Sequence, residues 1–207
     1  MVNTFLPYPD FVQTAKALDY KRLGKQRVEA WQILQALRGQ TKGWINHPAS
    51  KMWAGHERAL CEYGIAICDE WISRGYKDTM RERFIAVHSD LPDTGLPVWI
   101  GDPHLHESHQ SNLIRKDPDH YEFHVMSDLP YLWFTESGYN DQNQLCIKYR
   151  IGATKYSQIF VHHKIRKELS HMQRMHEMLT ERDVEDRKNK KVGKKPNESK
   201  SKAGALN

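Results

Sequence analysis

Apolar residues recur every three or four positions through much of the first half of the chain, and this spacing is typical of helices with one buried face. Asp10 stands where it would cap a short helix that reaches about Leu18. Asp19 would cap a longer helix over Tyr20–Arg38, which Gly39 would end in a left-handed conformation. The pattern therefore predicts two consecutive helices in this part of the chain.

The same periodicity predicts more helices further along. Pro48 would open one long helix that Gly75 closes, with a buried face made of Trp53, Leu60, Tyr63, Ile67 and Trp71. Helices are also expected over residues 78–87 and 106–116, and the segment 88–103 between them is rich in proline and glycine. That segment is predicted to be a connection built from turns.

The two ends of the chain differ from this helical middle. Residues 3–9 read as an extended arm, and the polar stretch 135–155 could hold a strand or two. Charges alternate on a helical pattern over 157–187, which predicts a C-terminal helix, and the Lys-rich tail 188–207 is expected to be disordered. We therefore expect a mainly α protein, with a single compact helical domain over residues 1–156 before that helix and tail.

The composition is that of an ordinary soluble protein, with 39% apolar and 28% charged residues among 207. No stretch approaches the roughly 18 apolar residues of a membrane helix, and the first residues lack the pattern of a signal peptide. Cys61 and Cys68 lie on one predicted helix, where a rise of about 10 Å would separate them beyond disulfide reach. We expect a cytoplasmic protein with free thiols.

The formal net charge of +5 comes from the C-terminal end, because residues 182–207 hold nine Lys or Arg against four Asp or Glu. Residues 1–181 are therefore neutral overall. If the folded part binds nucleic acid, it must do so through a local cluster of cations.

One such cluster is predicted within Tyr20–Arg38. A single face of this helix would carry Arg22, Lys25, Gln26 and Glu29. These residues would suit a phosphate backbone beside an ionised carboxylate, whereas the ordinary alternative is a solvated face with ion pairs worth a few tenths of a kcal/mol. Gly24, in the same helix, indicates a close approach by DNA or by another helix.

Several ordered motifs over roughly residues 3–134 resemble the pyrimidine-dimer DNA glycosylase/AP-lyase family, the phage-type endonuclease V of dimer repair and its bacterial relatives. They are Thr4–Pro9, Arg22–Glu29, Gly43–Pro48, Met52–His56, Arg74–Thr79, Ser108–Pro118 and Pro130–Trp133. The resemblance implies an all-α enzyme of DNA repair that needs no metal. We accordingly expect a monomer that binds double-stranded DNA and uses no cofactor.

The resemblance also implies a bifunctional reaction. In the family, a free N-terminal α-amine attacks C1′ of the damaged nucleotide and forms an imine as the base leaves, and β-elimination then cuts the strand. An α-amine with a pKa near 7.7–8.0 is partly unprotonated at neutral pH. By this resemblance Val2 would supply the amine once Met1 is removed, and Glu29 would assist the proton transfers.

Three positions depart from the family's pattern. Val2 stands where the phage enzyme has threonine, and Val28 and Gln32 stand where it has arginine. The phosphate contacts would then fall to Arg22, Lys25 and Arg27. Two alternatives stay open: a glycosylase for a different modified base, or a non-catalytic DNA-binding module on the same scaffold.

Polar residues elsewhere are also candidates for DNA contact. His47 precedes a predicted helix, as a cap or as a DNA contact, and Tyr131 and Trp133 would stack on a base or be buried. The helix 106–116 would line the DNA groove with His109, Ser111, Arg115 and Lys116. A third alternative, a metal-dependent nuclease, would use His104, His106, Glu107 and His109, but their spacing matches no zinc motif.

The lysine-rich tail is either a solubilising extension or a tether that holds the protein near DNA, and the tether makes a testable prediction. Deleting residues 188–207 is expected to weaken binding to undamaged duplex DNA and to flatten its salt dependence, because fewer counterions are released. Fluorescence anisotropy over a series of salt concentrations measures both effects. An unchanged salt slope would rule out the tether.

Overall fold

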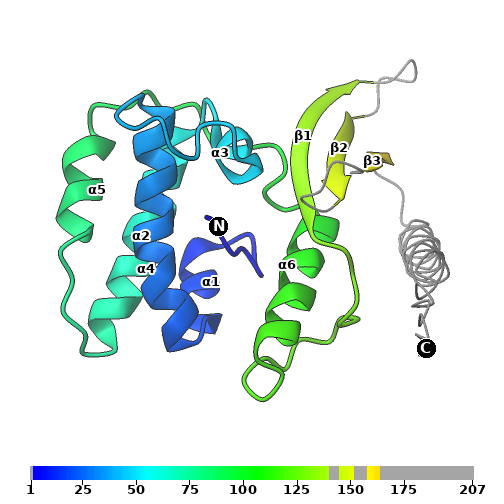
Figure 1. Ribbon diagram of the computed structural model, residues 1–207, viewed down its shortest axis with the longest axis horizontal. Coiled ribbons are helices and arrows are strands. Elements are labelled where there is room, and N and C mark those ends of the chain that lie inside the picture. Colours follow the sequence, from blue (N-terminus) through cyan, green and yellow to red (C-terminus); the bar gives the residue numbers. More distant parts are fainter. Residues whose placement is uncertain (1, 140–144, 152–157, 164–207) are drawn as a thin grey trace, which may run out of the picture. The chain divides into compact units, whose positions relative to one another are not determined.

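The computed structural model describes residues 2–139, 145–151 and 158–163, all within one compact unit, Met1–Leu169. In these residues the protein is mainly α, as predicted (Figure 1). The helices are α1 (Phe11–Ala17), α2 (Tyr20–Leu37), α3 (Pro48–Trp53), α4 (Glu57–Ser73), α5 (Arg81–His88) and α6 (Pro103–Lys116). The strands β1 (Leu132–Tyr139), β2 (Leu145–Ile151) and β3 (Gln158–His163) form one antiparallel sheet in that order.

The first two helices begin at the caps that the sequence predicts. The Asp10 carboxylate accepts the Gln13 N–H at 2.6 Å, and Asp19 Oδ1 accepts the N–H groups of Lys21 and Arg22 at 2.8 and 3.1 Å. These bonds satisfy backbone donors that have no partner within the helix. The α2 helix ends at Leu37, and Gly39 follows it with a φ of 70°, as expected.

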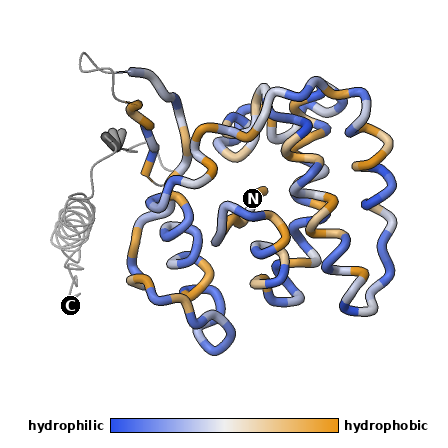
Figure 2. Tube along the Cα trace, turned by 180° about the vertical axis from the view of Figure 1, so that it is seen from behind, coloured by the Kyte–Doolittle hydropathy of each residue, from blue (hydrophilic) through white to orange (hydrophobic). Residues whose placement is uncertain are grey.

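α4 packs against α1, α2 and α5, and apolar side chains fill the space between them. Figure 2 shows hydrophobic and hydrophilic positions interleaved along these helices, which is the amphipathic pattern that predicts them. The largest fully buried side chains here include Trp53, Tyr63, Leu23, Ile33, Leu34, Leu60 and Ile67. No helix in the described part of the chain is long and apolar enough to cross a membrane.

The single long helix predicted from Pro48 to Gly75 is wrong, because the chain forms α3 and α4 with a break between them. Ala54 leaves the helical region with a ψ of 126°, and Gly55 follows with a φ of 82°. Glu57 Oε1 then accepts the Gly55 N–H at 3.1 Å, which ties the turn to the start of α4. The apolar spacing continues across this turn, so periodicity alone does not reveal it.

The C-terminal helix predicted from Ser157 is wrong at its start, where β3 pairs antiparallel with β2. Ile159, Phe160 and Val161 are residue types that favour strands, and they offset the alternating charges that favoured a helix. The sheet therefore extends the predicted domain beyond residue 156. The rest of the expected helix, 164–187, and the tail 188–207 lie outside the described residues.

The α4–α5 contact depends on a glycine. A Cβ atom built on Gly64 would lie 2.5 Å from Phe84 Cζ, closer than carbon atoms approach. Gly64→Ala is therefore expected to cost about 1–3 kcal/mol in the free energy of unfolding, as overpacked cores do. Urea denaturation measures this loss.

Gly138→Ala is the matched control, because no heavy atom lies within 4 Å of the Cβ built there. It should change the free energy of unfolding by no more than about 0.5 kcal/mol. If the two variants were equally stable, the close approach of Phe84 to α4 would be contradicted.

Candidate active site

The N-terminal arm does not lie on the surface but runs between α2 and α6 (Figure 1). Val2, Thr4, Phe5 and Leu6 are buried, and the backbone there bonds to side chains instead of to another strand. The Leu6 N–H donates to His109 Nδ1 at 2.8 Å. The arm is therefore held by helix side chains that lie far from it in the sequence.

The amide of Gln26, on α2, is the central contact of the arm. Its Oε1 accepts the Phe5 N–H at 2.8 Å and lies 2.6 Å from the Tyr63 hydroxyl, which donates to it. Its Nε2 donates to Glu29 Oε2 at 2.9 Å. These partners fix which end of the amide faces the carboxylate, and Gln26 itself is fully buried.

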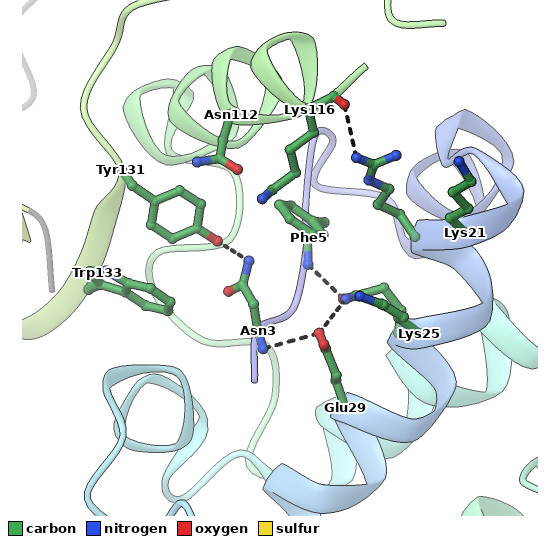
Figure 3. A pocket seen from close by; sticks show the side chains of 11 residues that line it. Asn3, Phe5, Lys21, Lys25, Glu29, Asn112, Lys116, Tyr131 and Trp133 are labelled. Atoms are coloured by element: carbon green, nitrogen blue, oxygen red, sulfur yellow. Dashed lines mark hydrogen bonds between the residues drawn. The ribbon is translucent and has the colours of Figure 1, made fainter. Parts of the chain in front are cut away.

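Glu29 lies one helical turn further along α2, with its carboxylate directed at the arm (Figure 3). Glu29 Oε2 also accepts the Asn3 N–H at 3.3 Å. Burial raises the pKa of Glu29, and the bonds from Asn3 and Gln26 and the charge of Lys25 lower it by less. The carboxyl therefore keeps a proton to higher pH than a free glutamate does, which suits a group that transfers protons.

A pocket of about 510 Å³ opens above this carboxylate, between α2, α6 and the start of β1 (Figure 3). Its lining residues are Asn3, Phe5, Lys21, Arg22, Lys25, Gln26, Glu29, Asn112, Lys116, Tyr131 and Trp133. Four of them are cations and one is a carboxylate, so the lining attracts anions although residues 1–181 are neutral overall.

The α2 and α6 walls of the pocket are joined by Arg22. Its guanidinium donates to the Lys116 carbonyl at 3.0 Å and lies 3.3 and 3.4 Å from the carboxylates of Asp19 and Asp117. The Lys116 amine extends into the pocket (Figure 3), 5.8 Å from the centre of the Phe5 ring. Partial desolvation and the nearby cations, Arg22 among them, lower the pKa of this amine.

The structure brings Arg22, Lys25, Gln26, Glu29 and Lys116 together, as the sequence predicts, but it directs Arg27 elsewhere. The Arg27 guanidinium forms a salt bridge with Asp78 and lies 4.2 Å from the centre of the Trp71 ring. A Cβ on Gly24 would meet the same ring at 3.0 Å. The close approach that Gly24 permits is therefore made by α4.

Three residues of α6 that were expected to contact DNA have structural partners instead. Ser111 Oγ accepts the Leu129 N–H at 3.0 Å and a bond from Arg115, and both side chains help to hold the segment before β1. His109 is buried, with its ring stacked on that of Tyr131 at a centroid distance of 5.0 Å. His109, Ser111 and Arg115 do not line the pocket.

His47 caps α3, where its Nδ1 accepts the Ala49 N–H at 3.2 Å, and burial lowers its pKa. Its ring is nearly perpendicular to the rings of Trp44 and Trp133, with ring centroids 5.5 and 5.6 Å away. His47 therefore stands behind the pocket wall, where it supports Trp133.

The other histidines of α6 also have structural bonds. His106 Nε2 accepts the Gly101 N–H at 2.9 Å, so its Nδ1–H donates to the Leu6 carbonyl at 2.8 Å. His104 contacts Asp102, the N-cap of α6, at 3.2 Å. The described residues contain no group of three or more His, Cys, Asp or Glu that is arranged to hold a metal ion.

Sequence reasoning missed four of the eleven residues that line the pocket. Asn3, Phe5, Lys21 and Asn112 gave no signal of their own, although Asn3 lies beside the residue to which the amine is assigned. Tyr131 accepts a hydrogen bond from the Asn3 amide, and Trp133 is tilted against it at 4.6 Å. The motif Pro130–Trp133 pointed to this aromatic wall, but not to its place beside the arm.

The burial of His109 predicts a pH dependence of stability. Burial lowers the pKa of His109 from 6.5 to about 3, with a smaller contribution from His106. Below pH 6.5 the His109 side chain therefore takes up a proton in the unfolded chain but not in the folded one. Its contribution to the free energy of unfolding falls as the pH falls toward 3. His109→Asn, whose amide oxygen can still accept the Leu6 N–H, should lose this dependence.

Below pH 6.5, the free energy of unfolding of the wild type should therefore fall more steeply than that of His109→Asn, and the difference in slope should approach about 1.4 kcal/mol per pH unit near pH 5. Chemical denaturation at several pH values measures the two slopes. His124→Asn, at an exposed histidine, is the control and should parallel the wild type. Parallel slopes for all three proteins would contradict the role given to His109.

Residues 2–83, which carry the arm and all of α1 to α4, match the family model described as pyrimidine dimer DNA glycosylase. No curated protein and no solved structure gave a match. The motifs after residue 83, including those of α6 and β1, lie beyond the matched segment. Over the residues that build Glu29 and its arm, the chain therefore matches the pyrimidine dimer DNA glycosylase family, as its motifs predicted.

Proposed function

We propose that the protein is a DNA glycosylase with AP-lyase activity, which acts on double-stranded DNA that contains a pyrimidine dimer or another damaged base. The observation that supports this most directly is the bond from the Asn3 N–H to Glu29 Oε2 at 3.3 Å. Val2 is covalently joined to Asn3, so an amine on Val2 would be one residue away from the carboxylate.

The proposed reaction begins at that amine. Its nitrogen attacks C1′ of the damaged nucleotide, and the bond from C1′ to the base breaks with its electron pair passing to the base. The nitrogen then loses a proton, and the C1′–O4′ bond breaks as C1′ and nitrogen form a double bond. The ring oxygen takes up a proton, which leaves the imine. A second proton is then removed from C2′, the C3′–O bond breaks, and the 3′ phosphate departs with one strand end.

Glu29 has two roles in this proposal. As a carboxylate it stabilises the positive charge that develops on the sugar when the base leaves. As a carboxyl with a raised pKa it accepts and returns protons at a pH nearer to neutral than an exposed glutamate would. The bonds from Asn3 and Gln26 hold one of its oxygens, so the side chain is oriented before DNA arrives.

The cations of the pocket would bind the phosphates on either side of the damaged nucleotide. Lys21, Lys25 and Lys116 carry compact charges on long stems, and Arg22 fixes the two walls together. The proposal needs no metal or organic cofactor, since the amine and the carboxyl supply the chemistry. We also propose that the protein acts as a monomer. Its cytoplasmic localisation stays a prediction from the sequence.

Trapping with borohydride tests the proposal. The purified protein is incubated with duplexes that carry a cyclobutane pyrimidine dimer, an abasic site or no lesion, and any imine is reduced. Mass spectrometry of peptides should locate the adduct on the N-terminal residue. An adduct on Lys116, whose amine lies in the pocket and has a lowered pKa, would replace the nucleophile but keep the reaction.

Glu29→Gln should lower the rate of strand cleavage about 10²–10⁴-fold, because general acid–base catalysis contributes that much. The amide oxygen can still accept the Asn3 N–H, so the melting temperature should change little. Glu122→Gln, at an exposed glutamate outside the pocket, is the control and should cut at the wild-type rate.

The outcomes separate the alternatives. Adducts with abasic DNA alone would keep the lyase step and assign the glycosylase to a different modified base. Intact strands and no adduct on any duplex would overturn the proposal in favour of a DNA-binding module.

A further inference from the structure

The loop between α2 and α3 holds a tryptophan in a strained conformation. Trp44 has a φ of 64°, and in the part of the chain that the structure describes it is the one residue other than glycine with a positive φ. Its side chain is 41% exposed, and the next residue, Ile45, is 45% exposed. An isolated exposed apolar side chain needs no explanation, but one held in a left-handed backbone next to a pocket does.

An unbroken row of aromatic rings connects Trp44 to the pocket. The Trp44 ring contacts His47 nearly at right angles with a centroid distance of 5.5 Å, and His47 contacts Trp133 in the same way at 5.6 Å. Trp133 lines the pocket, and the cap that His47 forms on α3 fixes the ring between them. The ring of His47 therefore links Trp44, which is itself partly exposed, to the pocket wall at Trp133.

The charges around Trp44 favour an anionic surface as its partner. Arg38–His56 contains no acidic residue, while Arg38, Lys42 and Lys51 are exposed cations. The nearby pocket adds Lys21 and Lys25. An exposed aromatic ring in a segment with exposed cations and no acidic residue is suited to a polyanion that also offers flat apolar surfaces, and the stacked bases of a duplex are such surfaces.

We propose that Trp44 is a wedge, whose ring enters the base stack of duplex DNA beside the damaged nucleotide and fills the space of a base that has left it. This rests on the proposed function, which supplies the duplex. A base must leave the stack for C1′ to become accessible, and the ring would keep the gap from closing. Lys42 and Lys51 would hold the phosphates on either side of that gap.

The left-handed backbone offers a variant that separates this role from folding. Trp44→Gly removes the ring and places at φ 64° the residue that adopts this conformation without strain. Its melting temperature should equal or exceed that of the wild type. Trp44→Ala removes the ring alone, and Trp44→Phe keeps a smaller one.

The opening of the base stack can be measured separately from strand cleavage. A duplex with a tetrahydrofuran abasic analogue and a neighbouring 2-aminopurine brightens when that base unstacks. Wild type and Glu29→Gln should both raise the fluorescence on binding, whereas Trp44→Gly and Trp44→Ala should not. Tyr139→Ala, which removes another exposed ring, is the matched control and should behave as the wild type.

Cleavage of abasic DNA in duplex and single-stranded form gives the second measurement. Trp44→Gly should lower kcat/KM at least about tenfold on the duplex and leave it within about twofold on the single strand, where no stack must open. Trp44→Phe should recover most of the duplex rate. Equal losses on both forms would make Trp44 a support of the pocket and overturn the wedge, as would wild-type fluorescence from Trp44→Ala.

A failure of the proposed function would be distinguishable from a failure of the wedge. If the wild type cleaved neither form, the proposed chemistry would be wrong. The fluorescence of the tetrahydrofuran duplex would still show whether Trp44 opens the stack.

Discussion

The buried amide of Gln26 is the contact on which the rest of the site depends. It accepts from the arm at Phe5 and from Tyr63 on α4, and it donates to Glu29 on its own helix. Leaving a buried donor or acceptor without a partner costs about 1–3 kcal/mol of folding free energy. Because all three bonds share one amide, a displacement of Gln26 would weaken them together. The start of the chain, the α2–α4 interface and the orientation of the carboxyl are therefore determined together.

Two electrostatic effects oppose each other at Glu29. Its hydrogen bonds and the charge of Lys25 favour the carboxylate, whereas burial favours the protonated acid and is the larger effect. The lysines around it carry positive charge that attracts phosphates, and partial burial, together with the nearby cations, lowers the pKa of Lys116. Glu29 thus keeps its proton to higher pH than a free glutamate does, and Lys116 releases its proton at lower pH than a free lysine does.

Local chemistry predicted most of what is local in this fold, and the misses other than the break at Gly55 are long-range. The Asp10 and Asp19 caps and the face of α2 follow from residues within one or two turns. The apolar spacing continues across the break at Gly55, so the spacing does not reveal it. β3 forms because it pairs with the edge of β2, a contact between separate segments. The arm is buried through bonds such as that from Leu6 to His109, 103 positions apart, which no periodicity encodes.

Three departures from ordinary local preferences lie in one pocket or one aromatic ring away from its wall. Gln26 is a fully buried amide, Glu29 is a half-buried carboxyl, and Trp44 has a backbone conformation that glycine would adopt more easily. Each costs folding free energy, and the surrounding structure must hold it in place. Arg27 shows the contrast: it is on the same helix, but its salt bridge with Asp78 and its contact with Trp71 direct it away from the pocket. Local conflicts of this kind are expected chiefly at functional sites, and this is a second reason, independent of the family match, to propose the pocket as the active site.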